Sequence, residues 1–176
     1  GEKAFIVIHL EGSHDRYKDR VPPDFTGIQV DGHSEKVNDY DSSILYTDDV
    51  LKRIYDYGKD HLNMQAMVYA SDHGEDMEYF HGDGKFTWEM ARIPLFVYLS
   101  DSYQKEYPET AKELALHKDD IFTNDLMYDL VCGILRAPNT GYDAKYDPTS
   151  PEFSFTKDQA TTRYGEIRIV DDPQLR

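Results

Sequence analysis

Two short polar motifs directly follow the two most apolar runs of the sequence. The motif EGSH (residues 11–14) follows the run 4–10, and the motif SDHGE (residues 71–75) follows the run 64–70. In a parallel α/β sheet, ligands bind beyond the carboxyl ends of the strands. If both runs are strands of one such sheet, both motifs lie at the edge where a binding site is expected.

The residue types in these motifs are suited to holding a metal ion or a phosphate group. Asp72 supplies a hard carboxylate oxygen and His73 a borderline imidazole nitrogen, which together suit zinc. Adjacent side chains of a regular strand point to opposite faces, but Gly74 lets the backbone turn, so that both can reach one ion. Together with His14 and His81, they predict a metal or phosphate site.

Three further charged residues flank this predicted site. Glu75 is interpreted as an outer acceptor that orients a ligand, with direct ligation or a solvated position as alternatives. Lys85 and Arg92 are candidates for contacting a phosphate, the alternative being ordinary exposed charges. A simple structural turn is the alternative for the Asp-His-Gly triplet itself.

Hydrophobic periodicity predicts the elements that must position these residues. The runs expected to form buried strands are 4–10, 64–71 and 93–99, the last entered through Pro94. Helical spacing predicts helices over 39–57 and 120–135. Because a strand, a helix and a strand in succession form a βαβ unit, we expect an α/β fold with a mostly parallel sheet.

Local signals define the expected ends of these elements. Asn38 or Asp39 can cap the start of the first helix, and Gly58 can end it. A length of 176 residues predicts a single domain. Within it, residues 139–176 are expected to be less regular, with one edge strand inside 165–170.

Composition excludes several classes of partner and site. The chain has 19 basic and 34 acidic residues, a net charge of −15, which argues against nucleic acid as a partner. The single cysteine, Cys132, excludes an internal disulfide framework and is expected to be buried and inert. No stretch approaches the roughly 20 apolar residues that a membrane span needs, so we expect this part of the protein to be soluble.

The motifs resemble, in the same order, those of bacterial phosphoethanolamine transferases, which belong to the sulfatase and alkaline phosphatase superfamily. Residues 9–25 are similar to that family's pattern His-x-x-Gly-Ser-His…Tyr…Arg-x-Pro…Phe. The helix sequence ILYTD and the segments SDHGE, FHG and RIPLFVYLS follow, so the resemblance covers residues 4 to 135. SDHGE alone is also found in ordinary sulfatases, whereas the first motif combined with ILYTD favours phosphoethanolamine transfer.

The resemblance implies a fold, a reaction and a set of ligands. The fold would be the C-terminal portion of a three-layer, alkaline-phosphatase-like sandwich. The reaction would move phosphoethanolamine from a phospholipid to a cell-surface lipid or glycan through a phospho-threonine intermediate, with one zinc ion and, as an alternative, two. Asp72 and His73 match the family's zinc-binding Asp-His pair, while His14 and His81 match positions that bind the transferred phosphate or a second zinc.

Two parts of the family's machinery have no counterpart in this sequence. The threonine nucleophile and a zinc-binding glutamate are expected upstream, in an N-terminal part of the same protein that this chain lacks. The chain alone is therefore expected to be inactive. The parent protein is expected to be anchored in the bacterial inner membrane, with this part at its extracytoplasmic face. The alternatives are a sulfatase or other phosphoryl or sulfuryl hydrolase of the superfamily, a non-catalytic metal- or phosphate-binding module, and a purely structural α/β domain.

Overall fold

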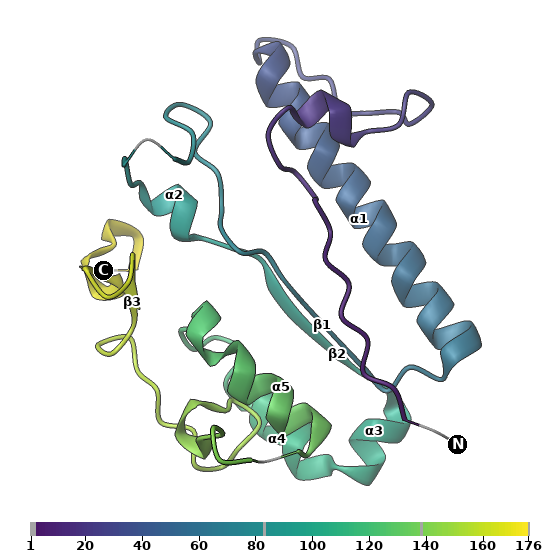
Figure 1. The fold of residues 1–176 in the computed structure, drawn as a ribbon, viewed down its shortest axis with the longest axis vertical. Helices are drawn as coiled ribbons and strands as arrows, with labels where there is room; N and C mark the ends of the chain where they lie inside the picture. The colour runs from purple at the N-terminus through teal and green to yellow at the C-terminus, as the bar shows by residue number, and fades with distance from the viewer. Residues whose placement is uncertain (1–2, 83, 138, 176) are drawn as a thin grey trace. The chain divides into compact units, whose positions relative to one another are not determined.

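The computed structural model describes residues 3–82, 84–137 and 139–175 (Figure 1). The chain divides into two compact units, Gly1–Asn63 and Met64–Arg176. The hypothesis that both belong to a single domain stays a prediction. No helix in the described ranges is both long and apolar enough to cross a membrane.

The first unit is built on one long helix, α1 (Glu35–Leu62). Its bounds correct the predicted range of 39–57, because both ends are capped by residues that lie further out. The Ser34 hydroxyl accepts a hydrogen bond from the backbone N–H of Val37. Asn63 takes up the left-handed conformation that ends the helix, with φ of 50°, whereas Gly58 is buried inside it.

The segment before α1 folds back onto that helix. It contains the short 3₁₀ helix η1 (Tyr17–Arg20), which packs against α1 (Figure 1). The Tyr17 side chain is buried, with 3% of its surface exposed, and its ring meets that of Tyr40 edge-on at 5.0 Å. Further along, the backbone N–H of Ile28 donates to the Ser42 hydroxyl at 2.9 Å. Aromatic packing and polar contacts therefore fix this segment to the helix.

The expected first strand, 4–10, is not a strand in this structure, so that prediction is wrong. None of the described residues forms a ladder with it, and four successive apolar residues are between 54% and 77% exposed, namely Phe5, Ile6, Val7 and Ile8. A buried strand needs neighbouring strands that take up its backbone hydrogen bonds and cover its side chains. The described chain supplies no such neighbours.

The second unit contains the other two predicted strands, β1 (Ala66–Ala70) and β2 (Leu95–Leu99). They pair antiparallel, with Ala66 opposite Leu99 and Ala70 opposite Leu95. One face of this pair packs on a core made by Leu99, Tyr103, Leu130 and Ile134. The core side chains come from β2 and from the helices α3 (Asp101–Glu106) and α5 (Met127–Leu135), with α4 (Pro108–Leu116) beside them.

The expected mostly parallel sheet is not found among the described residues. The sheets there are two-stranded and antiparallel, β1 with β2, and β3 (Thr161–Thr162) with β4 (Ile167–Arg168). Because the run 4–10 pairs with none of the described strands, the first strand of the expected βαβ unit is missing. The described residues form both helices and strands, and the predicted edge strand within 165–170 corresponds to β4. The mostly parallel, three-layer sandwich stays unconfirmed.

The last predicted helix, 120–135, begins later than expected. A 3₁₀ turn, η2 (Asn124–Leu126), precedes α5, which starts at Met127. Cys132, on α5, is buried as predicted. The shorter helices α2 (Trp88–Ala91), α3 and α4 have no counterpart among the predicted elements, because segments of four to nine residues span too few turns to show a clear helical period.

A buried carboxylate joins α5 to the following segment. Asp147 is 1% exposed, and its oxygens accept hydrogen bonds from the Tyr142 hydroxyl at 2.7 Å and from the Thr149 backbone at 2.8 Å. Burial raises the pKa of Asp147, while these hydrogen bonds oppose the shift. The carboxylate lies directly against Gly133, where a Cβ atom would be 2.0 Å from Asp147 Oδ2.

Candidate metal centre

The predicted Asp72–His73 pair lies in a tight turn immediately after β1. The Ser71 hydroxyl donates to the His73 carbonyl at 2.8 Å, and the His73 backbone N–H donates to Asp72 Oδ1 at 3.0 Å. From 52 residues further along the chain, the Asn124 side-chain amide donates to the Asp72 carbonyl at 2.9 Å. Local and long-range hydrogen bonds therefore hold the two adjacent side chains where the strand has ended, as the motif predicts.

Gly74 completes this turn by lying directly against the backbone of α2. Its N–H donates to the Met90 carbonyl at 2.8 Å. A Cβ atom at this position would lie 2.2 Å from the Glu89 carbonyl oxygen and 2.4 Å from that of Arg92. Gly74 is therefore required by the close approach of two backbone segments.

The geometry of the pair suits two ligands of one zinc ion. His73 Nδ1 lies 2.7 Å from the Gly74 carbonyl oxygen, which can only accept, so Nδ1 is the donor in this contact and the neutral ring keeps its lone pair on Nε2. His73 Nε2 lies 3.9 Å from Asp72 Oδ2. Two ligand atoms at about 2.0 Å from a tetrahedral zinc ion are roughly 3.3 Å apart. The two atoms must therefore come slightly closer, and the Asp72 side chain, which is 88% exposed, has room for that movement.

His81 lies beside this pair and is oriented by Glu75. Its Nδ1 is 2.6 Å from Glu75 Oε2, and its backbone N–H donates to Glu75 Oε1 at 2.8 Å. Only 5% of the Glu75 side chain is exposed, so this carboxylate is positioned as an acceptor rather than as a solvated surface group. The rings of His81 and His73 are 4.4 Å apart. The structure thus brings together Asp72, His73, Glu75 and His81.

The loop between Glu75 and His81 is ordered by an aspartate that sequence reasoning missed. Asp76 Oδ1 accepts hydrogen bonds from the backbone N–H groups of Glu78 at 2.7 Å and Tyr79 at 2.9 Å. Both hydrogen bonds stabilise the ionised carboxylate and so lower the pKa of Asp76, and the bond from Tyr79 has the larger effect. The sequence does carry a sign of this turn, because an aspartate often accepts hydrogen bonds from the backbone N–H groups two and three residues after it.

The two basic residues proposed to contact a phosphate have other partners. The Arg92 guanidinium donates to both oxygens of Asp172, whose side chain is 4% exposed, so the interpretation of Arg92 as a phosphate contact is replaced by a structural ion pair. The ammonium group of Lys85 lies over the Tyr79 ring, 5.3 Å from its centre. A role for Lys85 beside the metal centre stays a prediction.

His14 belongs to the first unit, in the loop between the run 4–10 and η1. Its backbone N–H donates to the Glu11 carbonyl at 3.2 Å, and its ring and carbonyl contact Arg20. The expectation that His14 joins the other three predicted site residues stays a prediction. Across the described ranges, no group of three or more His, Cys, Asp and Glu side chains has the geometry to hold a metal ion by itself. That Asp72 and His73 bind a metal ion stays a prediction.

Comparison with known proteins indicates the family. Residues 1–130 match the Sulfatase family. The chain is 33% identical over 131 residues, 67% of its length, to the Kdo(2)-lipid A phosphoethanolamine 7''-transferase of Escherichia coli (strain K12), of which it covers 23%. It is 27% identical over 192 residues, 96% of its length, to phosphoethanolamine transferase EptC of Escherichia coli O18:K1:H7 (strain RS218 / NMEC), of which it covers 32%. The chain thus spans a quarter to a third of these relatives.

Solved structures give the same relationship. The C-terminal periplasmic domain of EptC from Escherichia coli superposes with a TM-score of 0.63 at 25% sequence identity, over 85% of this chain and 46% of that one. The corresponding domain from Campylobacter jejuni gives a TM-score of 0.64 at 24% identity, over 83% of this chain and 51% of that one, which supports the fold. With three quarters of its length matched by the family, this chain belongs to the Sulfatase family, and its relatives include phosphoethanolamine transferases.

Proposed function

We propose that this chain is the C-terminal, zinc-binding portion of a phosphoethanolamine transferase. The observation that carries the proposal is the turn after β1, in which His73 Nδ1 faces the Gly74 carbonyl oxygen at 2.7 Å. This contact leaves Nε2 as a ligand beside Asp72. The names of the relatives support the chemistry, since two of those compared are phosphoethanolamine transferases.

In this proposal, each described residue has a defined task. Zinc, when bound, would lower the pKa of a hydroxyl nucleophile and neutralise charge on the phosphoryl group. Asp72 and His73 would hold the ion, and Gly74 and Asn124 would keep their turn in place. His81, held by Glu75, would present its Nε2 to the transferred phosphoryl group or to a second zinc ion, and His14 would approach the same group. The threonine nucleophile would lie in a part of the protein that precedes this chain.

The partners follow from the same proposal. The donor would be a phospholipid that carries phosphoethanolamine, and the acceptor a cell-surface lipid or glycan. The named target of one relative is a lipid A, which fits a lipid acceptor. A periplasmic location at the inner membrane is supported by the solved neighbours, whose titles describe periplasmic domains.

Zinc binding by the chain is expected to be weak and to depend on the predicted pair. We expect Asp72→Ala and His73→Ala each to weaken zinc binding in a calorimetric titration by about tenfold or more, since two ligands alone leave an open, readily exchanged ion. Asp60→Ala and His61→Ala are matched controls, because this second Asp-His pair lies exposed on α1, and they should leave the affinity unchanged.

The outcomes of this titration distinguish the alternatives. Tight zinc binding that is lost in both site variants would favour a self-sufficient metal-binding module over an incomplete half-site. Equal affinity in all variants would contradict the metal centre. Transfer of phosphoethanolamine by the complete reading frame, from phosphatidylethanolamine vesicles to a lipid acceptor, separates the transferase from a hydrolase, which would instead release phosphate or sulfate from simple esters.

A further inference from the structure

We propose that Arg20 is the positioning residue for His14, acting by holding the loop 11–15 in a single conformation. The contacts are within the first unit, and the catalytic consequence rests on the proposed function, in which His14 approaches the transferred phosphoryl group. Arg20 would not touch that group itself. It would fix the backbone carbonyls of His14 and Asp15, the Glu11 side chain and one edge of the His14 imidazole ring.

The Arg20 guanidinium contacts three residues of the loop through different nitrogen atoms. Nε donates to the His14 carbonyl at 3.1 Å, and Nη2 donates to the Asp15 carbonyl at 3.0 Å. Nη1 donates to the Glu11 carboxylate, and Nη2 also lies 3.4 Å from His14 Nδ1. One side chain therefore joins both ends of the loop, Glu11 and Asp15, and also His14.

This arrangement needs the fork geometry of arginine. The guanidinium carries five N–H donors in one rigid plane, so it can bond several acceptors in fixed directions. A lysine ammonium would carry the same charge to the same region, but its donors radiate from one atom at the end of a flexible stem. A lysine at position 20 could therefore re-form the ion pair with Glu11, but it could not donate to the carbonyls of His14 and Asp15 at the same time.

Arg20 can hold the loop because it is itself anchored. It is the last residue of η1, and Tyr17, at the start of η1, is buried against α1. The Arg20 side chain is 23% exposed, whereas that of Glu11 is 76% exposed. The rigid partner in this interaction is therefore arginine on its helix, and the restrained partner is the loop.

Contacts within the loop also shape its conformation, among them that of His14 Nδ1 with the Asp15 carbonyl oxygen at 3.4 Å. Gly12 has φ of +52°, and the turn is closed by the hydrogen bond from the His14 N–H to the Glu11 carbonyl. The loop and η1 also border a shallow pocket of about 260 Å³, whose lining includes Glu11, Gly12, Asp19, Arg20 and Tyr46. Because loss of Arg20 would free two backbone carbonyls, we expect the loop, and with it His14, to sample several conformations.

A double-mutant cycle tests this inference in the complete reading frame. We expect Arg20→Met to lower the transfer kcat by about 10- to 100-fold with a much smaller change in KM, because misplacing a catalytic group by about 1 Å has effects of this size. Arg20→Lys should not restore the rate. In a His14→Ala background, Arg20→Met should cause little further loss, since it acts through His14. Full additivity, or rescue by lysine, would overturn the proposal.

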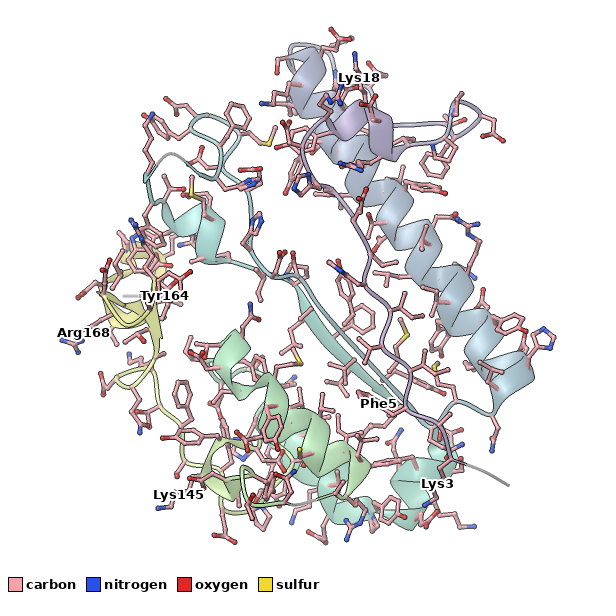
Figure 2. All side chains as sticks on the ribbon, viewed as in Figure 1. Lys3, Phe5, Lys18, Lys145, Tyr164 and Arg168 are labelled. Carbon is pink, nitrogen blue, oxygen red and sulfur yellow. The ribbon has the colours of Figure 1, made fainter. Side chains whose placement is uncertain are left out.

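A spectroscopic arm on the present chain keeps the inference separate from the proposed function. Arg20→Met should shift and broaden the ring resonances of His14 in ¹H–¹³C spectra and leave those of His61, on α1, unchanged. Lys18→Met is the control, because Lys18 lies on the same helix with an exposed side chain (Figure 2). If the complete protein has no transferase activity while His14 responds as described, the proposed function fails and the positioning role stands. Unchanged His14 resonances would overturn the positioning role.

Discussion

Replacing Gly74 by alanine is expected to weaken zinc binding and to lower the stability of the second unit. The added Cβ would lie 2.2 Å and 2.4 Å from two backbone carbonyl oxygens, those of Glu89 and Arg92. Backbone atoms cannot rotate away as a side chain can, so the turn or α2 must shift. Overpacking of this kind costs about 1–3 kcal/mol, and occasionally more. Because the turn holds Asp72 and His73, its displacement should weaken zinc binding by more than about tenfold.

The two effects can be measured separately. Denaturant unfolding gives the loss of stability, and calorimetry gives the zinc affinity of the variant under conditions where it is still folded. Gly141→Ala is the matched control, since its Cβ would approach only side-chain atoms, at 3.2 Å and beyond, and it should be nearly neutral in both measurements. A Gly74→Ala variant with wild-type zinc affinity would show that the turn does not position the ligands.

Gly133→Ala, in α5, is expected to cause a large loss of stability. Its Cβ would lie 2.0 Å from Asp147 Oδ2 and 2.4 Å from Thr149 Oγ1. Asp147 cannot retreat without breaking the bonds to Tyr142 and Thr149 that satisfy its buried carboxylate. The combined cost of overpacking and of unsatisfied polar groups is about 3 kcal/mol or more.

A second substitution shows whether the clash is the cause. In an Asp147→Ala background, the space that the carboxylate occupied is vacated. Adding Gly133→Ala there should therefore cost much less than it does in the wild-type chain, which unfolding by denaturant would measure as a non-additive pair. Equal losses in the two backgrounds would mean that the added methyl group clashes with another neighbour and not with Asp147, because helix propensity alone favours alanine over glycine at this position.

The parts of the structure that the sequence predicted are those governed by local patterns. The apolar runs that became β1 and β2, and the turn of Asp72, His73 and Gly74 after β1, were predictable because strand periodicity and turn chemistry act over a few residues. An acceptor role for Glu75 was one of three predicted alternatives, and the structure identifies His81 as its partner. The burial of Glu75, which the sequence does not reveal, selects among them.

The predictions that failed depended on distant partners. The run 4–10 has the composition of a buried strand but pairs with none of the described strands, so composition alone could not establish its conformation. Asn124, which holds the Asp72 carbonyl, is 52 residues away in sequence. Arg92 was a candidate for a phosphate contact, with an exposed charge as the alternative, and its partner Asp172 lies 80 residues away. Helix ends moved for a different reason, since Ser34 and Asn63 cap the helix in the structure, beyond the residues nearer the apolar pattern that could also have served.

The chemistry attributed to this chain depends on a single pair of adjacent side chains acting as ligands of the same ion. Diffraction data collected on either side of the zinc absorption edge, from crystals grown with zinc, test this directly. The account predicts an anomalous peak about 2.0–2.2 Å from both an Asp72 carboxylate oxygen and His73 Nε2. Ordered Asp72 and His73 side chains that point apart, with no anomalous density near either of them, would contradict it.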